Sequence, residues 1–257
     1  MDAVAIPATG GSEPVGDSSP RILLEDGPLL GVWKPAGLLT QGVPGGLPTL
    51  ESWVREWLKQ RYQKTGNVYL GIPHRLDRPV SGVIVFARNS KAAARLSEVF
   101  RERRVKKTYV AVVRGRLPAE TGTLNHWLLK DAEAAHSLVV PEGTPGSKIA
   151  TLEYRVLEAR DDRSLVEVDL QTGRMHQIRV QMAAMSCPVL GDWEYGSTSG
   201  EPAIPPSADA DPTARRPAVE QIALHARRLE IPHPIRFDNV LIEAPFPTHW
   251  TTYWLEG

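Results

Sequence analysis

Hydrophobic and polar residues follow two different periods along the chain, which predicts a mixture of strands and helices. Two short apolar runs within residues 21–35 meet at Asp26-Gly27 and predict a β-hairpin. Apolar residues at helical spacing within residues 50–58 follow Thr49, a residue type that caps helix N-termini, and predict a helix. The first patterned part of the chain therefore combines a hairpin with an amphipathic helix.

The same mixture continues toward the C-terminus. The apolar run 83–87 predicts a buried strand, and Asn89 or Ser90 then caps a helix with an apolar inner face and the cations RERR at its end. Further strands are expected at 107–115, 152–157, 164–170, 223–231 and 239–245, and a further helix at 176–186. Strands outnumber helices in an irregular order, so the pattern predicts an α+β fold rather than a doubly wound one.

Two segments lack this periodicity. Residues 1–20 are rich in Gly, Pro, Ser and Asp, which predicts a disordered leader. Residues 197–220 carry Pro, Ala and Asp without a period, and patterned sequence resumes after them. We therefore expect one domain over residues 21–257 with a flexible loop at 197–220.

The composition restricts the class of protein. The chain has 257 residues, enough for a substantial core, and a single cysteine, Cys187, so it can form no internal disulfide and a cysteine-based zinc site is disfavoured. No apolar run approaches the roughly 18–20 residues that span a bilayer, and the N-terminus lacks the pattern of a signal peptide. We expect a soluble cytoplasmic protein without a membrane partner.

The charges are unevenly distributed although the formal net charge is zero. Residues 74–116 contain 12 Lys and Arg but only 3 Asp and Glu. Such a basic block indicates a phosphate-rich partner, and a solvated helix face is an alternative that charge alone leaves open.

Several common site motifs are missing from the sequence. It contains no GxxxxGK[ST] or GxGxxG phosphate loop, no HExxH or HxE…PCxxC metal motif, and no GxSxG nucleophile motif. These absences leave the usual cofactor, metal and serine-nucleophile chemistries unsupported, so we predict neither a cofactor nor a metal.

Three segments together could form a reactive site. Asp77 lies in HRLDRPVSG ahead of a buried strand, Tyr109 begins a strand in KKTYVAVVRG, and Arg174 and Arg179 flank a turn in QTGRMHQIRV. Taken singly, each has a structural explanation: a loop salt bridge, a core tyrosine and a capped helix start. Their joint presence favours chemistry.

The segment HRLDRPVSGVIVFAR resembles HRLDxxTSG, the signature of the RluA-type pseudouridine synthases. The similarity continues in the family's order through KPAGLLTQ (34–41), KKTYVAVVRG (106–115), TGRMHQIRVQM (172–182), PVLGDWEYG (188–196) and LHARRLEIPHP (224–234). The resemblance implies a single α+β catalytic domain with a mixed, largely antiparallel central sheet, flanking helices and a central cleft. Many relatives also carry an S4 RNA-binding module, and we expect the form without it, because only about 20 residues precede the first strand.

The resemblance also implies an activity, the isomerisation of specific uridines to pseudouridine in ribosomal or transfer RNA. It gives Asp77 the role of nucleophile, by direct attack or through a glycal route. It makes Arg179 the cation that keeps this carboxylate ionised, and Tyr109 the residue that stacks under the base and helps remove the C5 proton. The target uridine must be flipped out of the RNA. Nothing is oxidised or hydrolysed overall, which agrees with the missing cofactor and metal motifs.

Other residues are expected to contact the RNA. By resemblance, Arg75 fills the stack that the uridine vacates, and Leu224 packs near the flipped base. The remaining expected RNA-binding residues are His74, Arg78, Lys106, Lys107 and Arg174. The expected partner is RNA, with no membrane and no metal, and we expect a monomer.

Two positions depart from the family pattern. Val80 stands where the family has Thr, and Gln181 where a His is common.

Two other functions compete with this assignment. One rival is a non-catalytic RNA-binding protein or RNA chaperone on the same fold. The other is a glycosidase-like hydrolase, which is disfavoured because it normally needs two opposed carboxylates and the three motifs offer only Asp77.

Overall fold

The computed structural model describes residues 18–42, 46–131, 136–196, 221–247 and 250. The loop predicted at 197–220 and almost all of the leader predicted at 1–20 lie outside the described residues. The chain divides into two compact units. Among the described residues, those within 13–107 and 226–247 form the first unit, and those within 108–225 belong to the second.

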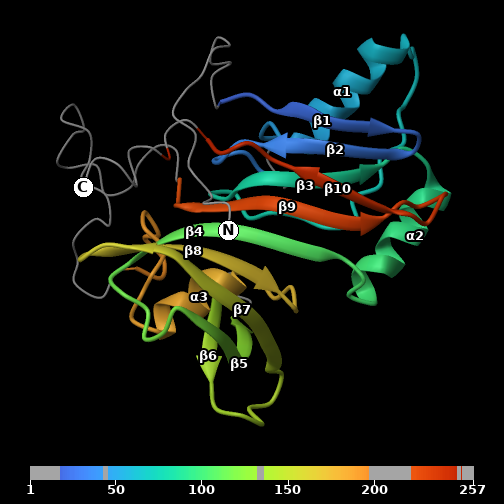
Figure 1. The fold of residues 1–257 in the computed structure, drawn as a ribbon. Helices are drawn as coiled ribbons and strands as arrows, with labels where there is room; N and C mark the ends of the chain where they lie inside the picture. Colours follow the sequence, from blue (N-terminus) through green and yellow to red (C-terminus); the bar gives the residue numbers. More distant parts are fainter. Residues whose placement is uncertain (1–17, 43–45, 132–135, 197–220, 248–249, 251–257) are drawn as a thin grey trace. The chain divides into compact units, whose positions relative to one another are not determined.

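The first unit contains a sheet with helices on it (Figure 1). Its elements are β1 (Arg21–Asp26), β2 (Leu29–Lys34), α1 (Leu50–Tyr62), β3 (Ser81–Ala87), α2 (Ser90–Arg101), most of β9 (Leu224–Pro232) and β10 (Asn239–Glu243). The strand order is β1-β2-β3-β9, and β10 also pairs with β9. The β1/β2, β2/β3 and β9/β10 pairs are antiparallel.

Local sequence accounts for these elements. Gly27 turns the β1–β2 hairpin with φ of 52°, a left-handed conformation that glycine adopts readily. Thr49 and Ser52 form a reciprocal capping box at the start of α1. The apolar face of α1 packs on β2 and β3; the buried members of this core are Leu30, Val32, Leu50, Val54, Leu58, Val68, Leu70, Ile84 and Phe86.

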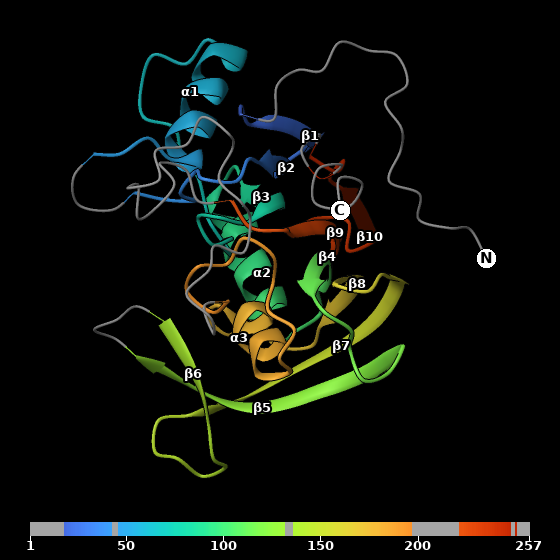
Figure 2. The ribbon, with the colours of Figure 1, turned by 90° about the vertical axis from the view of Figure 1, so that its left-hand side faces the viewer.

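The second unit is an antiparallel sheet with one helix against it (Figure 2). Its elements are most of β4 (Lys106–Arg114), β5 (Thr121–Asp131), β6 (His136–Val140), β7 (Lys148–Ala159), β8 (Arg163–Leu170) and α3 (Gln177–Ala184). The strand order is β4-β8-β7-β5-β6. Helix α3 contacts β5 and β6, and Val180 packs with Leu128 and Ala150 of the sheet.

Most predicted elements are confirmed, but β5 and β6 were not predicted. In β5 the buried positions are Leu124 and Leu128, four residues apart, so the strand lacks the alternation by which strands are recognised. Elsewhere the predicted strands and helices agree with the structure to within a few residues at their ends.

Candidate active site

Asp77 lies in the loop 74–80, which leads into β3 in the first unit. The backbone on both sides of Asp77 is held by the neighbouring loop 34–40. Thr40 Oγ1 donates to Leu76 O at 2.8 Å and accepts from Leu76 N at 3.2 Å. Gly37 N donates to Arg78 O at 2.8 Å. The half-buried Asp77 therefore sits on a backbone that is fixed immediately before and after it.

A buried lysine that we did not predict as a site residue lies behind this loop. Lys34 is 0% exposed, and its ammonium donates to the carbonyls of Pro35 at 2.9 Å, Leu38 at 2.7 Å and Arg78 at 3.1 Å. Burial lowers the pKa of Lys34 to about 7, although the negative charge of Asp77 acts to raise it. Lys34 thus joins the two loops and places a titratable cation near the proposed nucleophile.

The start of β3 explains two features of HRLDRPVSG. Gly82 has φ of 125°, and a Cβ built on it would overlap the backbone of Ala226, so only glycine fits. Val80 is 2% exposed, and the environment of its side chain suits an apolar residue. The departure from Thr at this position therefore removes a hydroxyl from a buried site.

His74, a predicted RNA-binding residue, is tied into the first unit. Its Nε2 accepts a hydrogen bond from Val85 N at 2.9 Å, and its ring stacks on Phe100 at a centroid distance of 4.4 Å. Burial, with the nearby charge of Lys107, lowers the pKa of His74 to about 3. The imidazole is therefore neutral, so any contact that it makes with RNA is not a cationic one.

The other predicted RNA-binding cations of the first unit differ in exposure. Arg75, Arg78 and Lys106 are exposed, and Arg78 Nε donates to Gly37 O at 3.1 Å. Lys107 is half-buried, and burial, followed by the charge of Arg103, lowers its pKa. Arg103 was not among the predicted site residues, although its place in RERR next to the KKTY segment could have indicated it.

Tyr109 lies on β4 in the second unit, half-buried and opposite Val168 of β8. The preceding residue, Thr108, donates to Asp169 Oδ1 at 2.5 Å and fixes the start of the strand on this unit. Leu224, predicted to pack near the flipped base, is 3% exposed. Its role in RNA binding stays a prediction.

Arg179 lies on α3 and is held by carboxylates of its own unit. Its Nε and Nη2 form a bidentate pair with Asp192 at 2.6 and 2.8 Å, and Nη2 also lies 2.9 Å from Glu194 Oε2. Arg174, the other predicted arginine, donates from Nε to Ile149 O at 3.1 Å. Asp77 belongs to the first unit, so its predicted pairing with Arg179 stays a prediction.

Gln181, the second departure from the family pattern, is a structural residue of α3. It is 0% exposed, and its Nε2 lies within 3.2 Å of the carbonyls of Leu124 and Ala150 and 3.0 Å from His126 Nδ1. It therefore joins α3 to β5 and β7.

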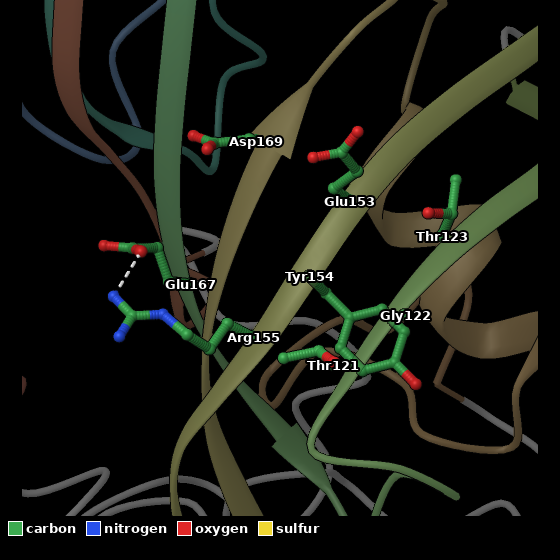
Figure 3. A pocket seen from close by; sticks show the side chains of 8 residues that line it. All are labelled: Thr121, Gly122, Thr123, Glu153, Tyr154, Arg155, Glu167 and Asp169. Carbon is green, nitrogen blue, oxygen red and sulfur yellow. Dashed lines mark hydrogen bonds and ion pairs between the residues drawn. The ribbon is translucent and has the colours of Figure 1, made fainter.

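A pocket of about 340 Å³ lies on the sheet of the second unit (Figure 3). Its lining residues are Thr121, Gly122, Thr123, Glu153, Tyr154, Arg155, Glu167 and Asp169. Arg155 pairs with Glu167 at 2.8 Å, while Glu153 and Asp169 lie opposite each other on neighbouring strands. The pocket contains none of the predicted site residues, and its excess of carboxylates does not suit a phosphate-rich ligand.

Metal-binding clusters and membrane-spanning helices are both absent from the part of the chain that the structure describes. No three or more His, Cys, Asp or Glu side chains gather there in a way that could hold a metal ion. None of the helices there is long and apolar enough to cross a membrane.

Sequence comparisons agree with the resemblance of the motifs. A family model described as RNA pseudouridylate synthase matches residues 29–184. An uncharacterized RNA pseudouridine synthase of Bacillus subtilis (strain 168) is 34% identical over 233 residues, which are 88% of this chain and 68% of the relative. A dual-specificity RNA pseudouridine synthase of Yersinia pestis is 36% identical over 214 residues, 83% of this chain and 92% of the relative. The chain spans 62% of a ribosomal large subunit pseudouridine synthase D of Nitrosomonas europaea, at 34% identity.

Solved structures show the same fold. Human RNA pseudouridylate synthase domain containing 4 matches with a TM-score of 0.71 and 24% identity, over 90% of each chain. Human RNA pseudouridylate synthase domain containing 1 matches with a TM-score of 0.67 and 28% identity, over 92% of this chain and 87% of the other. These matches confirm the predicted fold class, a single domain with a mixed, largely antiparallel sheet and a few helices.

Proposed function

Since the chain belongs to the RNA pseudouridylate synthase family, whose members are isomerases, we propose that it converts specific uridines of ribosomal or transfer RNA to pseudouridine. In this reaction the N1–C1′ bond breaks, the base rotates, C5 bonds to C1′, and the proton on C5 leaves while N1 gains one. Uridine and pseudouridine contain the same atoms, and the reaction oxidises and hydrolyses nothing overall. The proposed enzyme therefore needs neither a cofactor nor a metal. We also propose that it is a cytoplasmic monomer.

One observation supports Asp77 as the nucleophile more than any other. The residues on both sides of Asp77 are hydrogen-bonded to the loop 34–40. The buried ammonium of Lys34 also donates to the carbonyl of Arg78, next to Asp77. A carboxylate on a fixed backbone near a positive charge is suited to remain ionised and to attack an electrophilic sugar carbon.

The remaining roles follow the family pattern residue by residue. Arg179 is the proposed charge partner of Asp77, and Tyr109 stacks under the base and assists removal of the C5 proton. The uridine is flipped out of the RNA at a cost of a few kcal/mol, and Arg75 fills the gap that it leaves. The cations around Lys106 and Lys107 bind the adjoining phosphates.

The first prediction concerns Asp77. Release of tritium from RNA labelled with [5-³H]uridine measures the reaction, because C5 loses its hydrogen when it bonds to C1′. We expect Asp77→Asn to lower this rate by about 10³-fold or more while RNA binding persists, because Asn keeps the shape of Asp but lacks its charge and nucleophilicity.

Asp161→Asn is a matched control, because Asp161 is fully exposed and lies outside the three motifs. It should retain the wild-type rate. Retention of that rate by Asp77→Asn would show that Asp77 is not the nucleophile. If the wild-type protein binds RNA but releases no tritium from any cellular RNA, the non-catalytic RNA-binding alternative is correct instead.

A further inference from the structure

Arg179 in the second unit makes more contacts than its proposed pairing with Asp77 would need. The arginine is only 5% exposed, and Asp192 pairs with it through both carboxylate oxygens. The ring of Tyr195 covers one face of the guanidinium, 4.9 Å from Cζ to the ring centroid. These contacts fix the plane of the guanidinium as well as its position.

Asp192 is itself held in place by the turn that it begins. Its Oδ1 accepts from the backbone N–H groups of Glu194 at 3.1 Å and Tyr195 at 3.2 Å, and its carbonyl accepts from Gly196 N at 2.8 Å. A Cβ built on Gly196 would overlap the Asp192 carbonyl, so this turn also depends on a glycine. The carboxylate that binds Arg179 is therefore as rigid as the backbone around it.

Tyr195 connects this turn to the hairpin β5–β6. Its hydroxyl accepts from Ser137 N at 2.8 Å and lies 2.9 Å from His176 Nδ1 at the start of α3. Burial raises the pKa of Tyr195 to about 12, so the phenol stays protonated and keeps these bonds at neutral pH. The ring also packs against Val180 and the sheet.

We propose that Asp192 is a positioning residue for the isomerisation, which it supports by fixing the orientation of Arg179. This inference rests on the proposed function, in which Arg179 is the charge partner of the nucleophile. An unrestrained arginine side chain has many rotamers, whereas a bidentate pair with a buried carboxylate leaves one. Glu194, whose side chain is 31% exposed, adds a single contact and is a weaker restraint.

Asp192→Asn tests this role because it keeps the size of the side chain and its Oδ1 acceptor but removes the charge. We expect kcat to fall about 10- to 100-fold with an unchanged KM for RNA, because a misplaced catalytic group slows chemistry without weakening binding. Glu194→Gln removes the weaker partner of Arg179 and serves for comparison. It should lower kcat by less than about threefold, as expected for a partly exposed ion pair.

A double-mutant cycle separates positioning from a general loss of structure. If Asp192 acts through Arg179, the variant carrying Arg179→Ala and Asp192→Asn should be no slower than Arg179→Ala alone. A wild-type kcat in Asp192→Asn, or effects that multiply in the double variant, would overturn the proposal.

A spectroscopic measurement tests the positioning without relying on activity. The Nε–H signal of Arg179 in ¹⁵N NMR should exchange slowly with water in the wild type and rapidly in Asp192→Asn. Equal exchange in both proteins contradicts the proposed positioning. An inactive wild-type protein with the expected difference in exchange instead contradicts the proposed function and leaves the restraint of Arg179 by Asp192 established.

Discussion

At the scale of single residues, the least expected feature is the buried ammonium of Lys34. Its three hydrogen bonds all go to backbone carbonyls, so it stabilises the shape of two loops rather than a single ion pair. Burying a lysine is costly, and the lowered pKa of about 7 expresses that cost. A residue with such a cost is expected to have a role that an apolar side chain could not take.

The second prediction is that Lys34→Met lowers both activity and stability. Three carbonyls lose their donor, and an unsatisfied buried acceptor costs about 1–3 kcal/mol. At pH 9, where the amine of Lys34 is largely neutral in the folded chain, we expect the free energy of unfolding to fall by about that amount in urea titrations. We also expect a lower kcat, because the loop of Asp77 loses a restraint. The control Lys64→Met, at an exposed lysine outside both loops, should change neither quantity.

The third prediction concerns the pH dependence of stability. The pKa of Lys34 is about 7 in the folded chain and about 10.4 when unfolded, so between these values the unfolded chain binds the extra proton. Stability should therefore rise with pH across this window, by at most about 1.4 kcal/mol per pH unit from this residue. Urea titrations from pH 7 to 9 should show this rise in the wild type and a smaller one in Lys34→Met; equal slopes would contradict the assignment.

The sequence predicted residues whose motifs are continuous in the chain. Asp77, Tyr109 and Arg179 each lie in a short segment with a recognisable pattern. The supporting roles of Lys34 and Asp192 depend on contacts across loops, with Arg78 in one case and Arg179 in the other. Spacing along the chain does not reveal such contacts, which explains why these two residues were missed.

At the scale of elements, the packing of β3 fixes the chain that follows Asp77. Gly82 brings this strand against the backbone of Ala226 on β9, closer than any side chain allows. The glycine in HRLDRPVSG is therefore a packing requirement of the sheet. The residues that follow it form a strand that is buried throughout.

The fourth prediction is that Gly82→Ala is strongly destabilising. The new methyl group would overlap backbone atoms, and alanine is also strained at φ of 125°, which alone costs about 1–3 kcal/mol. We expect a lower urea midpoint and loss of activity. Gly66→Ala is the matched control, since a Cβ there meets nothing within 4 Å, and it should leave the midpoint unchanged.

The elements differ in how well the sequence reveals them. The hairpin of β1 and β2 and the helix α1 carry strong local signals, a glycine turn and a capping box. The strands β5 and β6 carry none, because many of their side chains are exposed and their identity depends on pairing with β7 and with each other. These two segments form strands because they pair with distant parts of the chain, and local sequence patterns do not encode such pairing.

At the scale of the whole molecule, charge is separated along the sequence although the total is zero. The block 74–116 carries a large excess of cations, while the pocket on β5, β7 and β8 is lined by three carboxylates and one arginine. For the proposed RNA substrate, such a cationic block favours binding, whereas a pocket lined by carboxylates does not.

The fifth prediction is a strong dependence of RNA affinity on salt. For single-stranded RNA, each phosphate contact contributes about −0.7 to the slope of log K against log salt concentration. Lys107→Ala should make this slope shallower by about 0.7, measured by fluorescence anisotropy at several salt concentrations. Lys64→Ala, outside the basic block, should leave the slope unchanged; an unchanged slope in Lys107→Ala would remove this lysine from the phosphate-binding set.

The lowered pKa of Lys34 also makes this residue a chemical reporter. An amine that titrates near neutral pH is largely unprotonated under mildly alkaline conditions, in which exposed lysines remain charged and acylate slowly. Burial shields Lys34 from an acylating reagent as long as the loops 34–40 and 74–80 stay packed together. The rate at which Lys34 becomes labelled therefore measures how often the loop of Asp77 opens, and a bound RNA that holds this loop closed would slow the labelling.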